Sequence, residues 1–253
     1  MKVPYKSLST EQLMRYSRHI MLNDMDIDGQ EILWNSRILL IGVGGLGCAV
    51  AQYLTASGVG SLTLVDDDIV ERTNLQRQVL HTEAAIGINK CVSAVQRLQQ
   101  INSEVEFQII QQRLIATELD EQVAAHDLVI DCCDNLATRN AINQACVKHQ
   151  TPLVSGAAIR FEGQVAVFDM QEHSPCYGCF SLLFGEQQLT CVDAGVLSPL
   201  VGMVGSIQAI EAIKLLTHIG TTLTGKLLLI DAAQMQIKPL TLNKHSSCLI
   251  CSK

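Results

Sequence analysis

A glycine-rich turn directly after an apolar run is the feature that most constrains how this chain can fold. Residues 37–42 (RILLIG) are continuously apolar after Arg37, which is typical of a parallel strand buried on both faces. The turn that follows has Gly42, Gly44 and Gly47 in the pattern G-x-G-x-x-G. Glycines let the backbone approach a phosphate, and the next helix offers free N–H groups at its start. The pattern predicts a Rossmann-like nucleotide-binding unit without saying which nucleotide it binds.

Expected strands and helices alternate along the first two thirds of the chain. The strands are expected at 37–42, 61–66, 105–110, 127–131 and 152–155, and the helices at 9–22, 45–57, 82–100, 117–125 and 136–149. This alternation favours right-handed βαβ crossovers and an α/β fold with a doubly wound, mainly parallel sheet. Further strands are expected at 164–169, 226–231 and 235–240, around a helix at 199–216. We expect these C-terminal strands to extend or flank the sheet as antiparallel strands.

Length and charge limit the class of protein. With 253 residues the chain can form one large α/β domain, in which we distinguish an N-terminal helical arm (1–35), a nucleotide-binding half (36–160) and a second half (161–253). The net charge of −7 argues against a nucleic-acid partner, whose phosphates attract basic surfaces. The N-terminus has no apolar stretch behind its charges, so we expect no secretion signal and a cytoplasmic protein.

The most apolar segment, residues 194–213, raises the alternative of a membrane span. Pro199, Gln208, Glu211 and Lys214 interrupt or flank this segment. Polar and charged side chains are costly in the lipid interior. We therefore expect a buried helix and no membrane partner.

Charged residues follow the predicted strands at the edge where a nucleotide would bind. Asp66 ends the second strand, where an acidic side chain can bond ribose hydroxyls. Arg77 and Lys90 follow it, and Asp134 lies just past the fourth strand. A triphosphate needs cations and a metal ion more than a dinucleotide does. The set favours ATP with Asp134 as a Mg²⁺ ligand, and a nicotinamide-dependent oxidoreductase is the competing hypothesis.

Two Cys-x-x-Cys pairs frame the last third of the chain. Together Cys176, Cys179, Cys248 and Cys251 would complete the tetrahedral shell of a structural Zn²⁺ ion with no open position. Such a site would hold the C-terminal tail against the loop near Cys176. Five other cysteines are expected as small core residues: Cys48, Cys91, Cys132, Cys133 and Cys146. Cys191 has no such assignment.

Several motifs together resemble the HesA/MoeB/ThiF family of the ubiquitin-activating superfamily, most of all its MoeB branch. They are GVGGLG (42–47), NLQRQ (74–78), DCCDN (131–135), VSGA (154–157), CYGC (176–179) and TCVDAGV (190–196). The resemblance spans nearly the whole chain. It implies ATP-dependent adenylylation of the C-terminal Gly-Gly carboxylate of a small ubiquitin-like sulfur carrier, which gives an acyl-adenylate and pyrophosphate. Molybdopterin synthesis is the expected pathway, and thiamine thiazole formation is the alternative.

The resemblance also assigns roles to residues and partners. It implies nucleotide contacts from Gly42, Gly44, Gly45, Gly47, Asp66, Thr73, Asn74, Leu75, Gln76, Arg77, Lys90, Asp134 and Asn135. Arg77, Lys90 and Asp134 would be catalytic, and Arg18 would reach the γ-phosphate across a homodimer interface. The second half (161–253) would bind the carrier, and a separate sulfurtransferase would supply sulfur.

The chain departs from the family pattern at two positions, and a third residue has two interpretations. Asn89 stands where the family often has proline, and Cys133 stands where it usually has threonine. In thioester-forming relatives, the cysteine that matches Cys191 bonds covalently to the carrier. From the sequence alone, Cys191 is either such a nucleophile or a loop thiol without a covalent role. A zinc-stabilised scaffold without catalysis is the third hypothesis.

Overall fold

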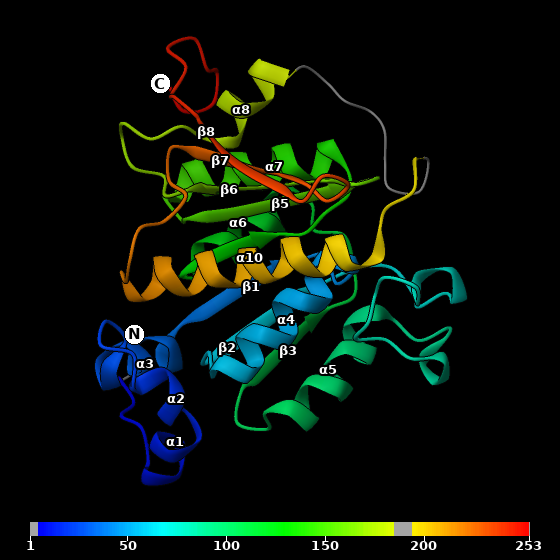
Figure 1. Cartoon of the computed structure of the whole chain (residues 1–253), viewed down its shortest axis with the longest axis vertical. Helices are drawn as coiled ribbons and strands as arrows, with labels where there is room; N and C mark the ends of the chain where they lie inside the picture. The colour runs from blue at the N-terminus through cyan, green and yellow to red at the C-terminus, as the bar shows by residue number, and fades with distance from the viewer. Residues whose placement is uncertain (1–4, 185–193, 253) are drawn as a thin grey trace.

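A mixed eight-stranded sheet forms the centre of the molecule in this computed structural model, which describes residues 5–184 and 194–252. The strand order is β3-β2-β1-β4-β5-β6-β7-β8 (Figure 1). The strands are β1 (Arg37–Ile41), β2 (Ser61–Val65), β3 (Glu106–Ile110), β4 (Leu128–Asp131), β5 (Leu153–Ile159), β6 (Glu162–Phe168), β7 (Lys226–Asp231) and β8 (Gln236–Thr241). Neighbours from β3 to β5 pair in parallel, and those from β5 to β8 pair antiparallel. The predicted fold class is confirmed.

Helices cover both faces of the sheet because the buried strands are apolar on both sides. The helices are α1 (Thr10–Arg15), α2 (Ser17–Ile20), α3 (Asp26–Asn35), α4 (Gly45–Ser57), α5 (Lys90–Ile101), α6 (Ala116–Ala125), α7 (Leu136–His149), α8 (Tyr177–Phe184) and α10 (Ser198–Thr217). On one face Ile38 and Leu40 pack with residues of α4, α5 and α10. On the other face Leu39 and Ile41 pack with residues of α6, α7 and α8. One apolar run thus supplies two cores, as strand alternation requires.

Helix α10 is the one described helix that is long and apolar enough to cross a membrane by length and composition. It lies along α4 and against the sheet (Figure 1). The two helices approach closely, since a Cβ added at Gly205 would lie 2.4 Å from the carbonyl oxygen of Leu46. Leu200, Val201 and Val204 are buried in the core. The helix therefore packs inside the fold, as expected from the residues that interrupt its apolar run.

Two predicted helices are wrong in their boundaries. The expected helix at 9–22 is broken at Tyr16, which is buried and accepts a hydrogen bond from Asn102 Nδ2 at 2.8 Å. The expected helix at 82–100 is two elements, a 3₁₀ turn at Glu83–Ala85 and α5. Gly87 separates them with φ 87°, a left-handed conformation that no helix continues through. Asn89 caps α5 by accepting from the N–H of Cys91 at 2.9 Å.

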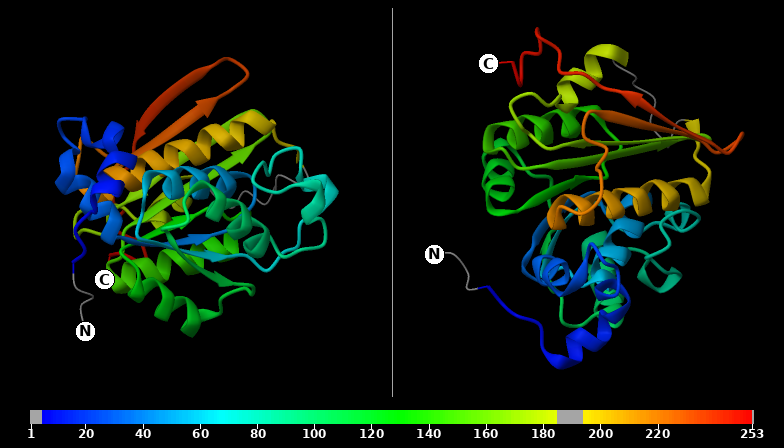
Figure 2. Two further views of the ribbon diagram at one scale, coloured as in Figure 1. Left: turned by 90° about the horizontal axis from the view of Figure 1, so that it is seen from below. Right: turned by 60° about the vertical axis from the view of Figure 1, so that its left-hand side comes forward.

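The antiparallel strands form the outer part of the sheet. Strand β5 runs four residues further than predicted and turns directly into β6, which begins at Glu162. The β7–β8 hairpin projects from the body of the molecule (Figure 2), and every residue of β8 is exposed. Helix α8 was not predicted. The sheet therefore ends in a ribbon that no described helix covers on its outer side.

Candidate active site

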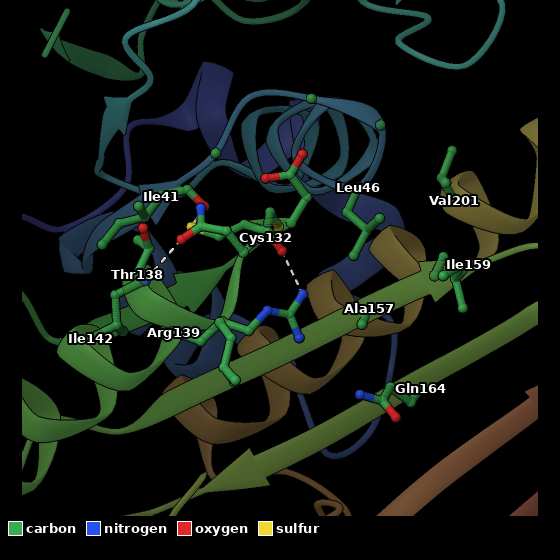
Figure 3. Close-up of a pocket in the computed structure, with 18 of the residues that line it drawn as sticks. Ile41, Leu46, Cys132, Thr138, Arg139, Ile142, Ala157, Ile159, Gln164 and Val201 are labelled. Atoms are coloured by element: carbon green, nitrogen blue, oxygen red, sulfur yellow. Dashed lines mark hydrogen bonds between the residues drawn. The ribbon is translucent and has the colours of Figure 1, made fainter. Parts of the chain in front are cut away.

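A cavity of about 870 Å³ lies beyond the carboxyl ends of β1, β2 and β4 and extends over β5 and β6 (Figure 3). The strand order reverses between β1 and β4, which is where ligands bind in open α/β sheets. The predicted nucleotide residues that line the cavity are Gly42, Gly44, Gly45, Asp66, Arg77, Lys90, Asp134 and Asn135. The fold therefore brings together residues from five separate segments of the sequence.

The glycine turn between β1 and α4 needs its glycines for close packing. Gly42 has φ 94°, and a Cβ there would lie 2.8 Å from the carbonyl oxygen of Cys132. A Cβ at Gly47 would lie 2.0 Å from the carbonyl oxygen of Gly42. Gly47 does not line the cavity, so its described role is to let α4 approach the turn. Gly44 and Gly45 border the cavity at the start of α4, where backbone N–H groups are free to bind an anion.

Asp66 is fixed beside this turn. Its Oδ2 accepts the N–H of Val43 at 2.7 Å, and its Oδ1 accepts the N–H of Asp68 at 2.9 Å. Burial raises the pKa of the carboxyl, and the positive charge of Lys90 opposes that shift. Each carboxylate oxygen has a second lone pair, so Asp66 can also accept bonds from ribose hydroxyls.

Lys90 and Arg77 bring positive charge to the same cavity. The Lys90 side chain is only 7% exposed, and its Nζ lies 2.8 Å from Oδ2 of Asp68, whose side chain is 67% exposed. Arg77 donates from Nη1 to the carbonyl oxygen of Thr73 at 3.2 Å. Lys90 is paired with an exposed carboxylate and Arg77 with a backbone carbonyl oxygen. A phosphate ligand can replace either partner.

Two residues that the sequence analysis did not assign support the turn. Gln78 is buried and lines the cavity, and its Oε1 has no hydrogen-bond partner among the described residues. His81 lies with Nε2 3.0 Å from the carbonyl oxygen of Val43 and Nδ1 2.9 Å from Oγ of Ser93. Burial lowers the pKa of His81, so the neutral ring donates to Val43 and accepts from Ser93. An unpaired buried amide at the cavity wall is consistent with a polar ligand there.

A buried polar network holds the loop after β4. Arg139 donates from Nη2 to the carbonyl oxygen of Cys133 (Figure 3) and also to that of Gly156, at 2.9 Å. Its Nε lies 3.8 Å from Oδ2 of Asp131, which also accepts from Oγ of Ser155 at 2.7 Å. Because these partners fix the backbone on both sides of Cys133, the network places the next residue, Asp134, at the cavity edge. Asp134 itself is exposed.

Asn135 and Cys133 are the other predicted residues of this loop. Asn135 caps α7 by accepting the N–H of Thr138 at 2.9 Å. Cys133 donates from Sγ to the carbonyl oxygen of Ile41 at 3.6 Å, a bond that a threonine hydroxyl could also make. Its burial keeps the thiol protonated, since desolvation raises the pKa of Cys133 well above its usual value. Cys133 is partly buried against the core and also lines the cavity, so its expected place in the core is confirmed only in part.

Several predicted site residues do not line the cavity. Four of them lie in the segment at 73–76, namely Thr73, Asn74, Leu75 and Gln76. The side chain of Asn74 accepts the N–H of Glu71 at 3.2 Å and so caps a 3₁₀ turn. Arg18 lies on the N-terminal arm, contacts Sδ of Met21 and does not line the cavity. Cys191 lies outside the described residues.

The four predicted metal ligands meet at the other end of α7. The Sγ atoms of Cys176, Cys179, Cys248 and Cys251 all lie within 4.8 Å of one another. The distance is 3.7 Å between Cys176 and Cys248 and 3.4 Å between Cys179 and Cys251. A tetrahedral site with Zn–S bonds of about 2.3 Å has sulfur atoms about 3.8 Å apart. This four-cysteine cluster could therefore hold one zinc ion.

Comparison with known proteins agrees with this geometry. The profile of the ThiF family matches residues 16–250. The chain belongs to the ThiF family. It is 48% identical to the molybdopterin-synthase adenylyltransferase of Escherichia coli K12 over 97% of this chain and 99% of the relative. It is 44% identical to the sulfur carrier protein ThiS adenylyltransferase of the same organism, over 96% of this chain and 97% of the relative. The Drosophila grimshawi relative named adenylyltransferase and sulfurtransferase MOCS3 is 41% identical over 99% of this chain and 57% of its own length.

Solved structures share the fold of this ThiF-family chain. Escherichia coli MccB, solved with MccA-N7isoASN, superposes with a TM-score of 0.84 at 24% identity and covers 97% of this chain and 76% of MccB. MccB solved with ATP gives a TM-score of 0.82 at 24% identity and covers 94% of this chain and 74% of MccB. At this level of identity the likeness shows the fold alone.

Proposed function

We propose that this ThiF-family chain is an adenylyltransferase that acts on a small sulfur-carrier protein for molybdopterin synthesis. Its relatives of nearly equal length, at 47% and 48% identity, are named molybdopterin-synthase adenylyltransferases. The names of these relatives favour adenylyl transfer over the oxidoreductase and the scaffold that the sequence left open.

The observation that carries the proposal is the shape and charge of the large cavity. At one end the glycine turn, Asp66, Arg77 and Lys90 offer groups for a ribose and phosphates. The cavity then passes Ala157 and continues over β6 to β7 and β8, where Lys238 lines it. An extended peptide can lie there with its terminal carboxylate directed at the phosphates, since the lining at Ala157 and Gly163 is small. One continuous cavity thus has room for a nucleotide and a carrier tail.

The chemistry follows from placement and charge. A peptide carboxylate is ionised at neutral pH, so its oxygen can attack the α-phosphorus without a general base. The new P–O bond forms as the bond to the bridging oxygen breaks, and pyrophosphate leaves with that electron pair. Arg77 and Lys90 would offset the charge on the phosphate oxygens, and the start of α4 would bind one of them. Asp134 would hold Mg²⁺, which neutralises phosphate charge when bound.

The proposal includes partners that the described residues do not by themselves define. We infer a cytoplasmic homodimer in which Arg18 of one subunit serves the cavity of the other, and a separate sulfurtransferase that acts on the activated carrier. The zinc ion at the four-cysteine cluster is inferred to be structural. A ThiS-like carrier is the second candidate substrate, because the ThiS adenylyltransferase is 44% identical over nearly the full length.

Exchange of radioactive pyrophosphate into ATP tests the function. We expect exchange when a molybdopterin-pathway carrier with an intact Gly-Gly terminus is added, and none when its last glycine is removed. A ThiS-like carrier in the same assay separates the two candidate substrates by their kcat/KM. If no Gly-Gly carrier supports exchange, the proposed function is wrong. Exchange without any carrier would also contradict it.

A further inference from the structure

Helix α7 carries buried polar side chains along one face, from the cavity to the four-cysteine cluster. Asn135 caps its start, Arg139 follows four residues later, and Asn143 follows after four more. Residues four apart share a face of a helix. Arg139 and Asn143 are both buried, where an apolar residue would be the ordinary choice. The contacts of the two side chains explain the pattern.

At the sulfur end, Asn143 binds the first Cys-x-x-Cys turn with both ends of its amide. Its Nδ2 donates to Sγ of Cys176 at 3.6 Å. Its Oδ1 accepts the backbone N–H of Tyr177 at 2.9 Å. One fully buried side chain therefore fixes a metal ligand and the residue that follows it. Such contacts around a metal site orient its ligands.

At the cavity end, Arg139 fixes the loop that carries Asp134. The guanidinium donates to the carbonyl oxygen of Cys133, and Asp131 accepts the N–H of Cys133 at 3.0 Å. The peptide groups on both sides of Cys133 are therefore held by the Arg139–Asp131 pair. Movement of Arg139 would change the position of Asp134 at the cavity.

Tyr177 lies between these two ends. Its phenol lies close enough to the guanidinium of Arg139 for each group to shift the pKa of the other, and its ring lines the cavity. The ring packs at an 84° angle against Phe168, with centroids 6.2 Å apart, and against Phe180 at 5.3 Å. Because Tyr177 directly follows Cys176, the thiolates that bind a metal ion also determine where the ring lies.

We propose that Asn143 and Tyr177 are positioning residues that couple metal occupancy of the four-cysteine cluster to nucleotide binding in the cavity. The metal fixes the Cys176–Cys179 turn, the turn fixes Tyr177 against Arg139, and Arg139 holds the Asp134 loop. This inference rests on the proposed function for the identity of the nucleotide. Coupling between two binding sites is reciprocal, so ATP must also raise the affinity of the four-cysteine cluster for zinc.

The first experiment uses the intact wild-type protein. Zinc transfer to a chromophoric chelator is followed with and without ATP and Mg²⁺, in the absence of carrier. In parallel, calorimetry gives the Kd of ATP for zinc-loaded and zinc-free protein, with circular dichroism showing that both are folded. We expect zinc to raise ATP affinity about tenfold, and ATP to raise zinc affinity by the same factor, a typical coupling between sites.

Variants then locate the coupling. Tyr177→Phe keeps the thiolates, the aromatic packing and the backbone N–H, but removes the hydroxyl beside Arg139. We expect zinc affinity without ATP to be unchanged and the coupling to fall to about twofold, on the scale of a lost hydrogen bond. Asn143→Leu should weaken both zinc binding and the coupling. Gln144→Leu, an exposed neighbour on the same helix, is the matched control and should change neither.

Each failure has a distinct signature. Zinc and ATP that bind independently would overturn the coupling and leave the proposed function intact. Zinc-loaded protein that binds no ATP would overturn both. If the four-cysteine cluster binds no zinc, the coupling is wrong and the proposed function stands. Full coupling in Tyr177→Phe would overturn the route through Arg139.

Discussion

The two halves of the sheet differ in what their strands offer. From β3 to β5 the strands are parallel, β1, β2 and β4 are almost wholly buried, and the carboxyl ends of these three strands carry polar groups of the cavity. From β6 to β8 the strands are antiparallel, and the last one is exposed along its whole length. In the first half the buried parallel strands hold charged side chains in place at one edge, where a small ligand can bind. The second half leaves an exposed surface that a partner protein can contact. The difference predicts that variants of the two halves fail in different ways.

The largest expected effect is on stability, in the parallel half. Arg139→Met should lower the free energy of unfolding by about 3–5 kcal/mol, because the carboxylate of Asp131 stays buried without its cation. Urea denaturation measures the change. Arg37→Met removes an exposed pair with Asp127 and should cost less than about 1 kcal/mol. Equal costs for the two variants would mean that burial of the Arg139 pair does not matter.

The next effect is on catalysis. Lys90→Ala should reduce carrier-dependent pyrophosphate exchange about 10²–10³-fold, because a charge that offsets the phosphates is lost. Stability should also fall, because the Lys90 side chain is buried and its charge opposes the burial-raised pKa of Asp66, so circular dichroism must show that the variant is folded. Lys148→Ala, which removes a lysine paired with Asp120 on the surface, should leave exchange unchanged. Loss of exchange in both variants would argue against a specific role for Lys90.

A smaller effect is expected at the exposed edge. Leu240, 43% exposed on β8 and part of the cavity lining, should contact the carrier, so Leu240→Ser should raise the KM for the carrier about tenfold without changing stability. The matched control is Ile109→Ser on β3, at the opposite edge of the same sheet. A KM that rises equally in both variants would remove the distinction between the edges.

The smallest effect is on the pH dependence of stability. Burial lowers the pKa of His81 and of His126, both in the parallel half, below the ordinary value of about 6.5. The unfolded chain therefore binds more protons, and stability falls as the pH drops below about 6.5. The slope is at most about 1.4 kcal/mol per pH unit for each histidine.

Denaturation at pH 7.5 and pH 5.5 measures this loss. The His81 ring lies within hydrogen-bond distance of the carbonyl oxygen of Val43. His81→Gln removes one of the two histidines whose pKa is lowered by burial, so it should reduce the pH dependence of stability. His173 is exposed in the second half, so His173→Gln should not change it. A loss of stability that is unaffected by His81→Gln would assign the dependence to other groups.

Sequence reasoning was most accurate where one local pattern decides the structure. The run at 37–42 and the helix at 136–149 were predicted within one residue, because apolar periodicity and caps are local signals. The four-cysteine cluster was also predicted from a local signal, because the Cys-x-x-Cys spacing by itself places two thiolates close together. The prediction of a continuous helix at 82–100 was wrong because Gly87 takes a left-handed conformation. The presence of a glycine in the sequence does not show which backbone conformation it adopts.

The parts of the site that depend on packing were harder to predict. Arg139 and His81 act through backbone carbonyls that are distant in sequence, so no local pattern identifies them. The four-residue spacing from Asn135 to Arg139 and Asn143 was the available signal, because it places all three on one face of α7. Conversely, motif membership alone did not place the residues at 73–76 on the cavity.

The last strand also limits how the molecule can assemble. An exposed edge offers unpaired backbone groups to any other extended chain. Pro239 lies in the middle of β8, where it lacks an N–H, and its neighbour Lys238 brings a charge. The proline therefore interrupts the row of donors that a ninth strand would need. At high concentration, Pro239 thus protects the protein from aggregation by strand pairing between the β8 edges of different molecules.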